Sequence, residues 1–140
     1  MGYTNYWNQK EDFTNGEWDI LKDEVNKIIK PFENNLDVED DDKNVIFLNG
    51  VGHNSHETFV FTKDKRNIHE WENEETFNKE GAFNFCKTNR KPYDLVVWNI
   101  LLSSIYYFAL GISHSVRICS TILMARGVVM FTPIGVFIMC

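Results

Sequence analysis

The most restrictive feature of the sequence is an almost uncharged run from Pro92 to Gly111, PYDLVVWNILLSSIYYFALG. Pro92 suits the first helical position, and Asp94 would lie in the first turn, where the helix dipole favours a negative charge. Gly111 is typical of the residue that follows a helix end. The run therefore predicts a helix over residues 93–110, either buried against a sheet or inserted in a membrane.

Charge is distributed unevenly along the chain. The sequence contains 14 basic and 20 acidic residues, and only Asp94, Arg117 and Arg126 among them follow Lys91. The net charge of −6 disfavours nucleic acid as a partner, because nucleic acid is itself densely negative. This distribution indicates a solvated first part followed by core or membrane segments.

The apolar run can be explained in two ways. Residues 95–112 approach the length that spans a bilayer, so one alternative is a membrane-associated protein anchored through this segment. However, Asn99 and Ser103 give the helix a polar side, and Arg126 interrupts the second apolar run at a cost in lipid. We therefore favour a buried helix over a membrane anchor.

Two further features predict a cytoplasmic protein. The first thirteen residues contain neither the basic nor the apolar region of a secretory signal. The sequence contains three cysteines, an odd number, and their spacing is not that of a zinc module. We therefore expect reduced thiols, as in a cytosolic protein.

Local patterns predict a second helix and four strands. Thr14 and Glu17 fit a capping box, and Phe13 and Trp18 occupy the positions of a hydrophobic staple. Apolar residues then recur at steps of three and four, predicting a helix over residues 16–30. Short apolar or alternating runs predict four strands, at residues 45–48, 57–62, 82–86 and 115–119.

These elements predict a single α+β domain over residues 1–140, with a small antiparallel sheet packed by two main helices. Residues 1–12 are expected to be a flexible arm, and residues 120–140 an apolar tail without an assigned structure. Residues 34–44 carry five carboxylates but lack the pattern of a calcium-binding loop, so they are interpreted as a solvated acidic connector.

The loop over residues 49–57 is longer than a tight hairpin needs, and such loops commonly carry function. His53, His56 and Glu57 form half of a metal or acid–base pattern, so a metal-dependent hydrolase-type site is one alternative. The spacing matches no known zinc-protease motif, and we expect no catalytic residues, metal or cofactor. Gly50 and Gly52 imitate a dinucleotide-binding loop, but no helix follows them, so they are expected to provide positive φ angles.

A basic cluster precedes the 93–110 helix, whose N-terminus would attract anions. Such a cluster is commonly no more than a set of solvated lysines at the end of a strand. Because the cluster and the 49–57 loop both follow strands, we expect them to lie side by side and to form the contact surface of a binding protein. Seven residues make up this predicted surface: His53, Ser55, His56, Glu57, Lys87, Arg90 and Lys91. The expected partner is another protein or a second copy of the chain, and nucleic acid is not expected.

The segment from Leu48 to Phe108 resembles a group of small uncharacterised phage and virus proteins. The resemblance lies in an N-G-x-G-x-x-S-H-E-T-F loop and an F-C-K-T-x-x-K-P-Y-D helix start. It implies a viral accessory protein in the host cytoplasm and brings no assigned activity. After Cys119 the sequence departs from the S-D-G turn expected in that group. An altered reading frame is one hypothesis for this departure, and sequencing of the coding region would test it.

Overall fold

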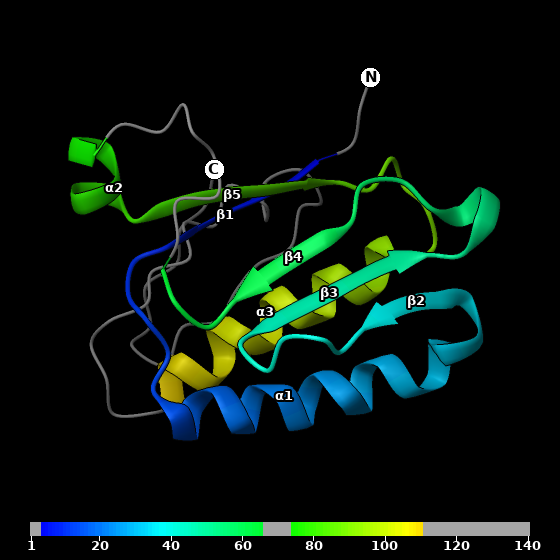
Figure 1. Cartoon of the computed structure of the whole chain (residues 1–140), viewed down its shortest axis with the longest axis horizontal. Coiled ribbons are helices and arrows are strands. Elements are labelled where there is room, and N and C mark those ends of the chain that lie inside the picture. Colours follow the sequence, from blue (N-terminus) through cyan, green and yellow to red (C-terminus); the bar gives the residue numbers. More distant parts are fainter. Residues whose placement is uncertain (1–3, 66–73, 111–140) are drawn as a thin grey trace.

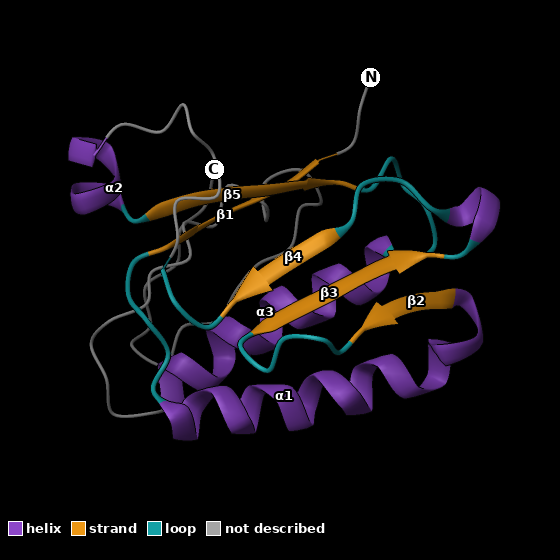
Figure 2. Ribbon diagram, viewed as in Figure 1, coloured by secondary structure: helices purple, strands orange, loops and turns teal. Residues whose placement is uncertain are grey.

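The computed structural model describes residues 4–65 and 74–110, which form an α+β fold with two antiparallel sheets and two main helices, α1 and α3 (Figures 1 and 2). The elements in chain order are β1 (Thr4–Gln9), α1 (Asn15–Ile29), the 3₁₀ turn η1 (Lys30–Asn35), β2 (Leu36–Glu39), β3 (Val45–Gly50), the 3₁₀ turn η2 (Gly52–Asn54), β4 (Phe59–Thr62), α2 (Glu74–Glu80), β5 (Ala82–Lys87) and α3 (Asp94–Leu110).

The two sheets are joined by a buried side chain. In one sheet β3 lies between β2 and β4, and in the other β1 pairs with β5. Gln9, at the end of β1, is buried, and its Nε2 donates to the carbonyl oxygens of Thr62 (3.1 Å), the last residue of β4, and of Lys63 (3.2 Å), which follows it. This amide therefore links the end of β1 to the end of the second sheet, where Lys63 O also accepts from Phe13 N (2.9 Å).

Helix α1 begins as its sequence predicts. Glu17 N donates to Thr14 Oγ1 (3.3 Å), and Thr14 N donates to Glu17 Oε2 (2.8 Å), which completes the capping box. The rings of Phe13 and Trp18 pack edge to face with centroids 5.4 Å apart. The staple therefore fixes the angle at which the chain enters α1.

Helix α3 is enclosed by protein over more than half of its circumference. Its buried positions Val96, Val97, Trp98, Ile100 and Leu101 cover an arc of about 200° at 100° per residue, whereas Leu95 and Asn99 are exposed. In Figure 1 α3 passes behind β3, and α1 runs below it. Burial against both α1 and the strands explains why this part of the sequence carries so little charge.

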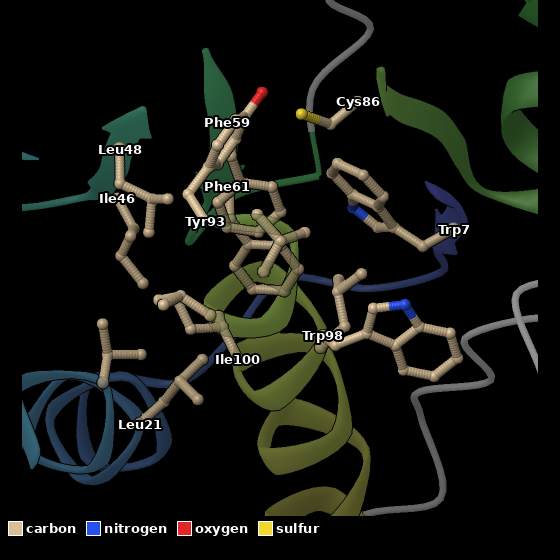
Figure 3. Close-up of a cluster of buried hydrophobic side chains, with 14 of the residues drawn as sticks. Trp7, Leu21, Ile46, Leu48, Phe59, Phe61, Cys86, Tyr93, Trp98 and Ile100 are labelled. Carbon is tan, nitrogen blue, oxygen red and sulfur yellow. The ribbon is translucent and has the colours of Figure 1, made fainter. Parts of the chain in front are cut away.

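The core contains side chains from both sheets and both main helices. Trp7 of β1 packs on Phe59 and Phe61 of β4, with ring centroids 5.4 and 6.1 Å apart. Figure 3 shows Trp7 and Trp98 on one side of this cluster and Leu21 and Ile46 on the other. One continuous cluster thus connects the N-terminal strand to α1 and α3.

The α+β class and the two main helices are confirmed, but the strand arrangement differs from the prediction in three respects. Residues 4–9 form β1, so the expectation of a flexible arm over residues 1–12 is wrong there. Residues 36–39 of the expected acidic connector form β2, and β5 pairs with β1 instead of extending the sheet of β3 and β4.

Some predictions cannot be compared with this structure. The strand at 115–119 and the tail at 120–140 lie outside the described residues. Within residues 4–65 and 74–110, no helix combines the length and the hydropathy needed to cross a bilayer.

Candidate functional site

The loop after β3 is held by its own side chains. The Asn49 side chain accepts from His56 N through Oδ1 (3.0 Å) and donates to His56 O through Nδ2 (3.0 Å). It therefore pairs with the His56 backbone as a neighbouring strand would. Ser55 Oγ donates to Gly52 O (2.7 Å). The loop is therefore closed by local bonds of the kind that Asn and Ser favour in turns.

The two glycines of this loop have different roles. Gly52 has a φ of +58°, which fits the expected need for a positive φ angle. At Gly50 the reason is close approach: a Cβ atom would lie 2.1 Å from the carbonyl oxygen of Asn54. Any side chain at Gly50 would force the loop backbone to move.

The turn between β5 and α3 has unusual backbone geometry. Lys91 N donates to Thr88 O (2.9 Å), and the two central residues, Asn89 and Arg90, have φ angles of 49° and 56°. This is the pattern of a type I′ turn, which favours Gly or Asn. Arg90 has a Cβ atom, so its left-handed conformation costs about 1–2 kcal/mol. Such strain persists only where surrounding contacts impose it.

Those contacts come from the loop after β3. The carbonyl oxygen of Lys87 can only accept, so His56 Nδ1, 2.6 Å away, carries the proton. Lys87 N donates to Glu57 Oε2 (2.9 Å), and Lys87 Nζ lies 3.6 Å from Glu57 Oε1. Lys91 Nζ donates to His53 O (2.6 Å). The loop and the turn are thus bonded directly, at the same end of the molecule in Figure 2.

The structure therefore brings the loop and the basic cluster together. We call the seven predicted residues the loop–turn surface: His53, Ser55, His56, Glu57, Lys87, Arg90 and Lys91. Most of them are exposed, and Glu57 and Lys91 are half-buried. Two of these side chains already make hydrogen bonds within the protein. The Glu57 carboxylate accepts from Lys87 N, and Lys91 Nζ donates to His53 O. Their ability to bind a partner remains a prediction.

Sequence reasoning missed a buried polar network beneath this surface. Asp94 Oδ1 accepts from Asn5 Nδ2 (2.8 Å) and from Thr88 Oγ1 (2.6 Å), and all three residues are buried. The sequence placed Asp94 in the first helical turn but gave no signal for Asn5, which lies 89 positions away. The network connects β1, the β5–α3 turn and α3.

A second buried pair lies at the same junction. Tyr93 Oη donates to Glu57 O (2.7 Å), and Cys86 Sγ lies 3.5 Å from that oxygen. Burial, reinforced by the negative charge of Glu57, raises the pKa of Cys86 to about 12, and burial also raises the pKa of Tyr93. A thiol that stays protonated at neutral pH is a poor nucleophile.

Cys86 should therefore resist alkylation in the folded protein. At neutral pH we expect iodoacetamide to leave it unmodified under native conditions and to modify it fully in denaturant, because unfolding restores an ordinary pKa. Peptide mapping by mass spectrometry reads this position separately from the other cysteines. Equal modification of Cys86 in the native and denatured protein would show that the thiol is exposed.

The side chains of the site can be compared with the metal and hydrolase alternatives. Among the residues that the structure describes, no three His, Cys, Asp or Glu side chains cluster so as to hold a metal ion. His56 Nδ1 and the Glu57 carboxylate, two groups of the hydrolase alternative, already bond to Lys87. What the surface presents is basic charge on an acidic chain, from Lys87, Arg90 and Lys91.

Comparisons of the chain with models of protein families, with curated proteins and with solved structures find no significant match. No family is therefore assigned.

Proposed function

We propose that the chain is a non-catalytic binding protein that recognises an acidic segment of a partner protein through the loop–turn surface. The supporting observation is the strained turn. Asn89 and Arg90 adopt consecutive left-handed conformations on a surface where Lys87 and Lys91 add further positive charge. Backbone strain of this kind is concentrated at functional sites.

The charge of the surface selects the class of partner. Glu57 is its only acidic member, and its carboxylate is engaged by Lys87. The chain as a whole carries −6, so long-range attraction for an acidic partner is weak and recognition depends on this local patch. A role as a viral or phage accessory protein in the host cytoplasm belongs to the same proposal and rests on the two sequence motifs.

The test uses two basic residues of the surface, Lys87 and Arg90, both of which are exposed. Random peptides displayed as a library are selected on the full chain, and acidic peptides are expected to be enriched. The Lys87→Gln/Arg90→Gly double variant should bind them roughly tenfold more weakly, because two rim charges together contribute about 1.4 kcal/mol. Lys27→Gln/Lys30→Gln, in the last turn of α1 and at the first residue of η1, makes a comparable charge change elsewhere and should bind normally.

Arg90→Gly also separates binding from folding. Glycine adopts a positive φ without strain, so the free energy of unfolding should stay the same or rise by up to about 1 kcal/mol while binding falls. The proposal would be wrong if no acidic peptides were enriched, or if the Lys27→Gln/Lys30→Gln control lost as much affinity as the double variant.

A further inference from the structure

A second surface of opposite charge lies between α1 and the β2–β3 hairpin. A groove of about 210 Å³ is lined there by Val25 and Ile29 of α1 and by Val38, Ile46 and Phe47 of the hairpin. Val38 is 43% exposed although it lies opposite Leu48, which is fully buried. Lys22, Asn26, Glu39 and Asp40 also line the groove, which therefore presents apolar surface with a polar margin.

The groove lies beside an edge strand. Within the described residues, β2 pairs with β3 on one side and ends the strand order of its sheet. Backbone N–H and C=O groups on the other side of an edge strand can receive an added strand. In Figure 1 β2 runs next to α1, so an added segment would pass along the mouth of the groove.

Acidic residues surround this edge. Asp37, Glu39, Asp40 and Asp41 are all exposed, and only Asp40 lies near a cation, 3.7 Å from Lys22 Nζ. A second copy of the chain at this edge would bring like charges together, which is destabilising. The same carboxylates would attract a segment rich in Lys or Arg.

We propose that this groove binds an extended basic segment of a partner protein. The segment adds a strand to β2, inserts one apolar side chain between Val25, Ile29 and Val38, and places Lys or Arg beside Asp37 and Glu39. Main-chain hydrogen bonds along the added strand provide affinity, and the alternate side chains provide specificity. This surface is distinct from the loop–turn surface in location and in charge.

The experiment selects displayed random peptides on the full chain and examines those rich in Lys and Arg. We expect the enriched peptides to combine basic residues with an apolar residue. Asp37→Lys/Glu39→Lys/Asp40→Lys should weaken their binding at least roughly tenfold, since charge pairing at the edge is reversed. Glu11→Lys/Glu74→Lys/Glu75→Lys makes the same charge change at exposed carboxylates elsewhere and should bind within about twofold of the parent.

A neutral variant separates the groove from general attraction of charge. Asn26 is exposed and lines the groove, so Asn26→Trp should fill the space, weaken the same peptides and leave the fold intact. Circular dichroism and the unfolding midpoint verify the fold of each variant.

Three results would overturn the inference. These are the absence of basic peptides among those selected, equal loss of binding in the two triple-lysine variants, or unchanged binding by Asn26→Trp. None of them bears on the loop–turn surface, which is tested with acidic peptides.

Discussion

Replacing Asp94 by alanine should lower the free energy of unfolding by roughly 3–5 kcal/mol, because each hydrogen bond to a charged group contributes about 1.5–3 kcal/mol. The side chain is 3% exposed, and its Oδ1 accepts from Asn5 Nδ2 and Thr88 Oγ1. Without the carboxylate, both buried donors lose their acceptor. Urea denaturation followed by tryptophan fluorescence measures the change.

Two further variants identify the cause of this loss. Asp94→Asn retains a carbonyl oxygen that can accept from both donors, so it should lose about half as much stability as Asp94→Ala. Asp23→Ala removes an exposed carboxylate from α1 and should change stability by roughly 0.5 kcal/mol or less. A loss below about 1 kcal/mol in Asp94→Ala would mean that the network does not stabilise the fold.

A double-mutant cycle measures the interaction energy between Asn5 and Asp94. Asn5→Ala alone should also be destabilising, and in the Asp94→Ala background its effect should shrink by about 0.5–3 kcal/mol, the range for groups in one network. Full additivity would contradict the bond between β1 and α3.

The elements that the sequence predicts correctly are those with strong local signals. Helix α1 was predicted over residues 16–30 and spans Asn15–Ile29, because its capping box and apolar stripe are contained in neighbouring residues. Helix α3 was predicted over residues 93–110 and spans Asp94–Leu110. In both cases the residues that mark the start of the helix lie within one or two helical turns of each other in the sequence.

Strand β1 gives no such signal. Its buried positions are Asn5, Trp7 and Gln9, so two of the three side chains that point inward are polar. The amides of Asn5 and Gln9 can be buried because Asp94 and the carbonyl of Thr62, the last residue of β4, accept from them. Those partners are 53 and 89 positions away along the chain, and hydrophobic alternation cannot reveal them.

Strand β2 was missed for a different reason. Of its four residues only Leu36 is buried, and acidic side chains at Asp37 and Glu39 match a solvated connector. Its strand conformation depends on pairing with β3, opposite Phe47 to Gly50. The same exposure and charge make β2 an edge that can receive a basic strand.

The candidate surface was predictable in position but not in construction. The sequence indicated that the 49–57 loop and the Lys87–Lys91 cluster would be neighbours, and the bonds from His56 and Glu57 to Lys87 confirm this. It gave no indication of the left-handed turn at Asn89 and Arg90. That geometry follows from contacts on both sides of the turn, and an Arg does not itself favour it.

Trp7→Ala should be as damaging as the loss of Asp94, with a decrease of roughly 3–5 kcal/mol in the free energy of unfolding. Trp7 is 2% exposed and packs on Phe59 and Phe61 of the other sheet. Truncation would leave a cavity between the sheets that the rigid strands cannot close fully. Urea denaturation monitored by far-UV circular dichroism gives the value without depending on the deleted tryptophan.

Tyr6→Ala is the matched control, because it removes an aromatic ring from the adjacent position of the same strand. Tyr6 is 41% exposed and stacks on Phe83 with centroids 6.0 Å apart, so its loss should cost about 1 kcal/mol or less. If β1 were a loosely attached arm, both variants would have small and similar effects. A large loss for Trp7 in one cooperative transition would instead show that the β1–β5 sheet unfolds together with the β2–β3–β4 sheet.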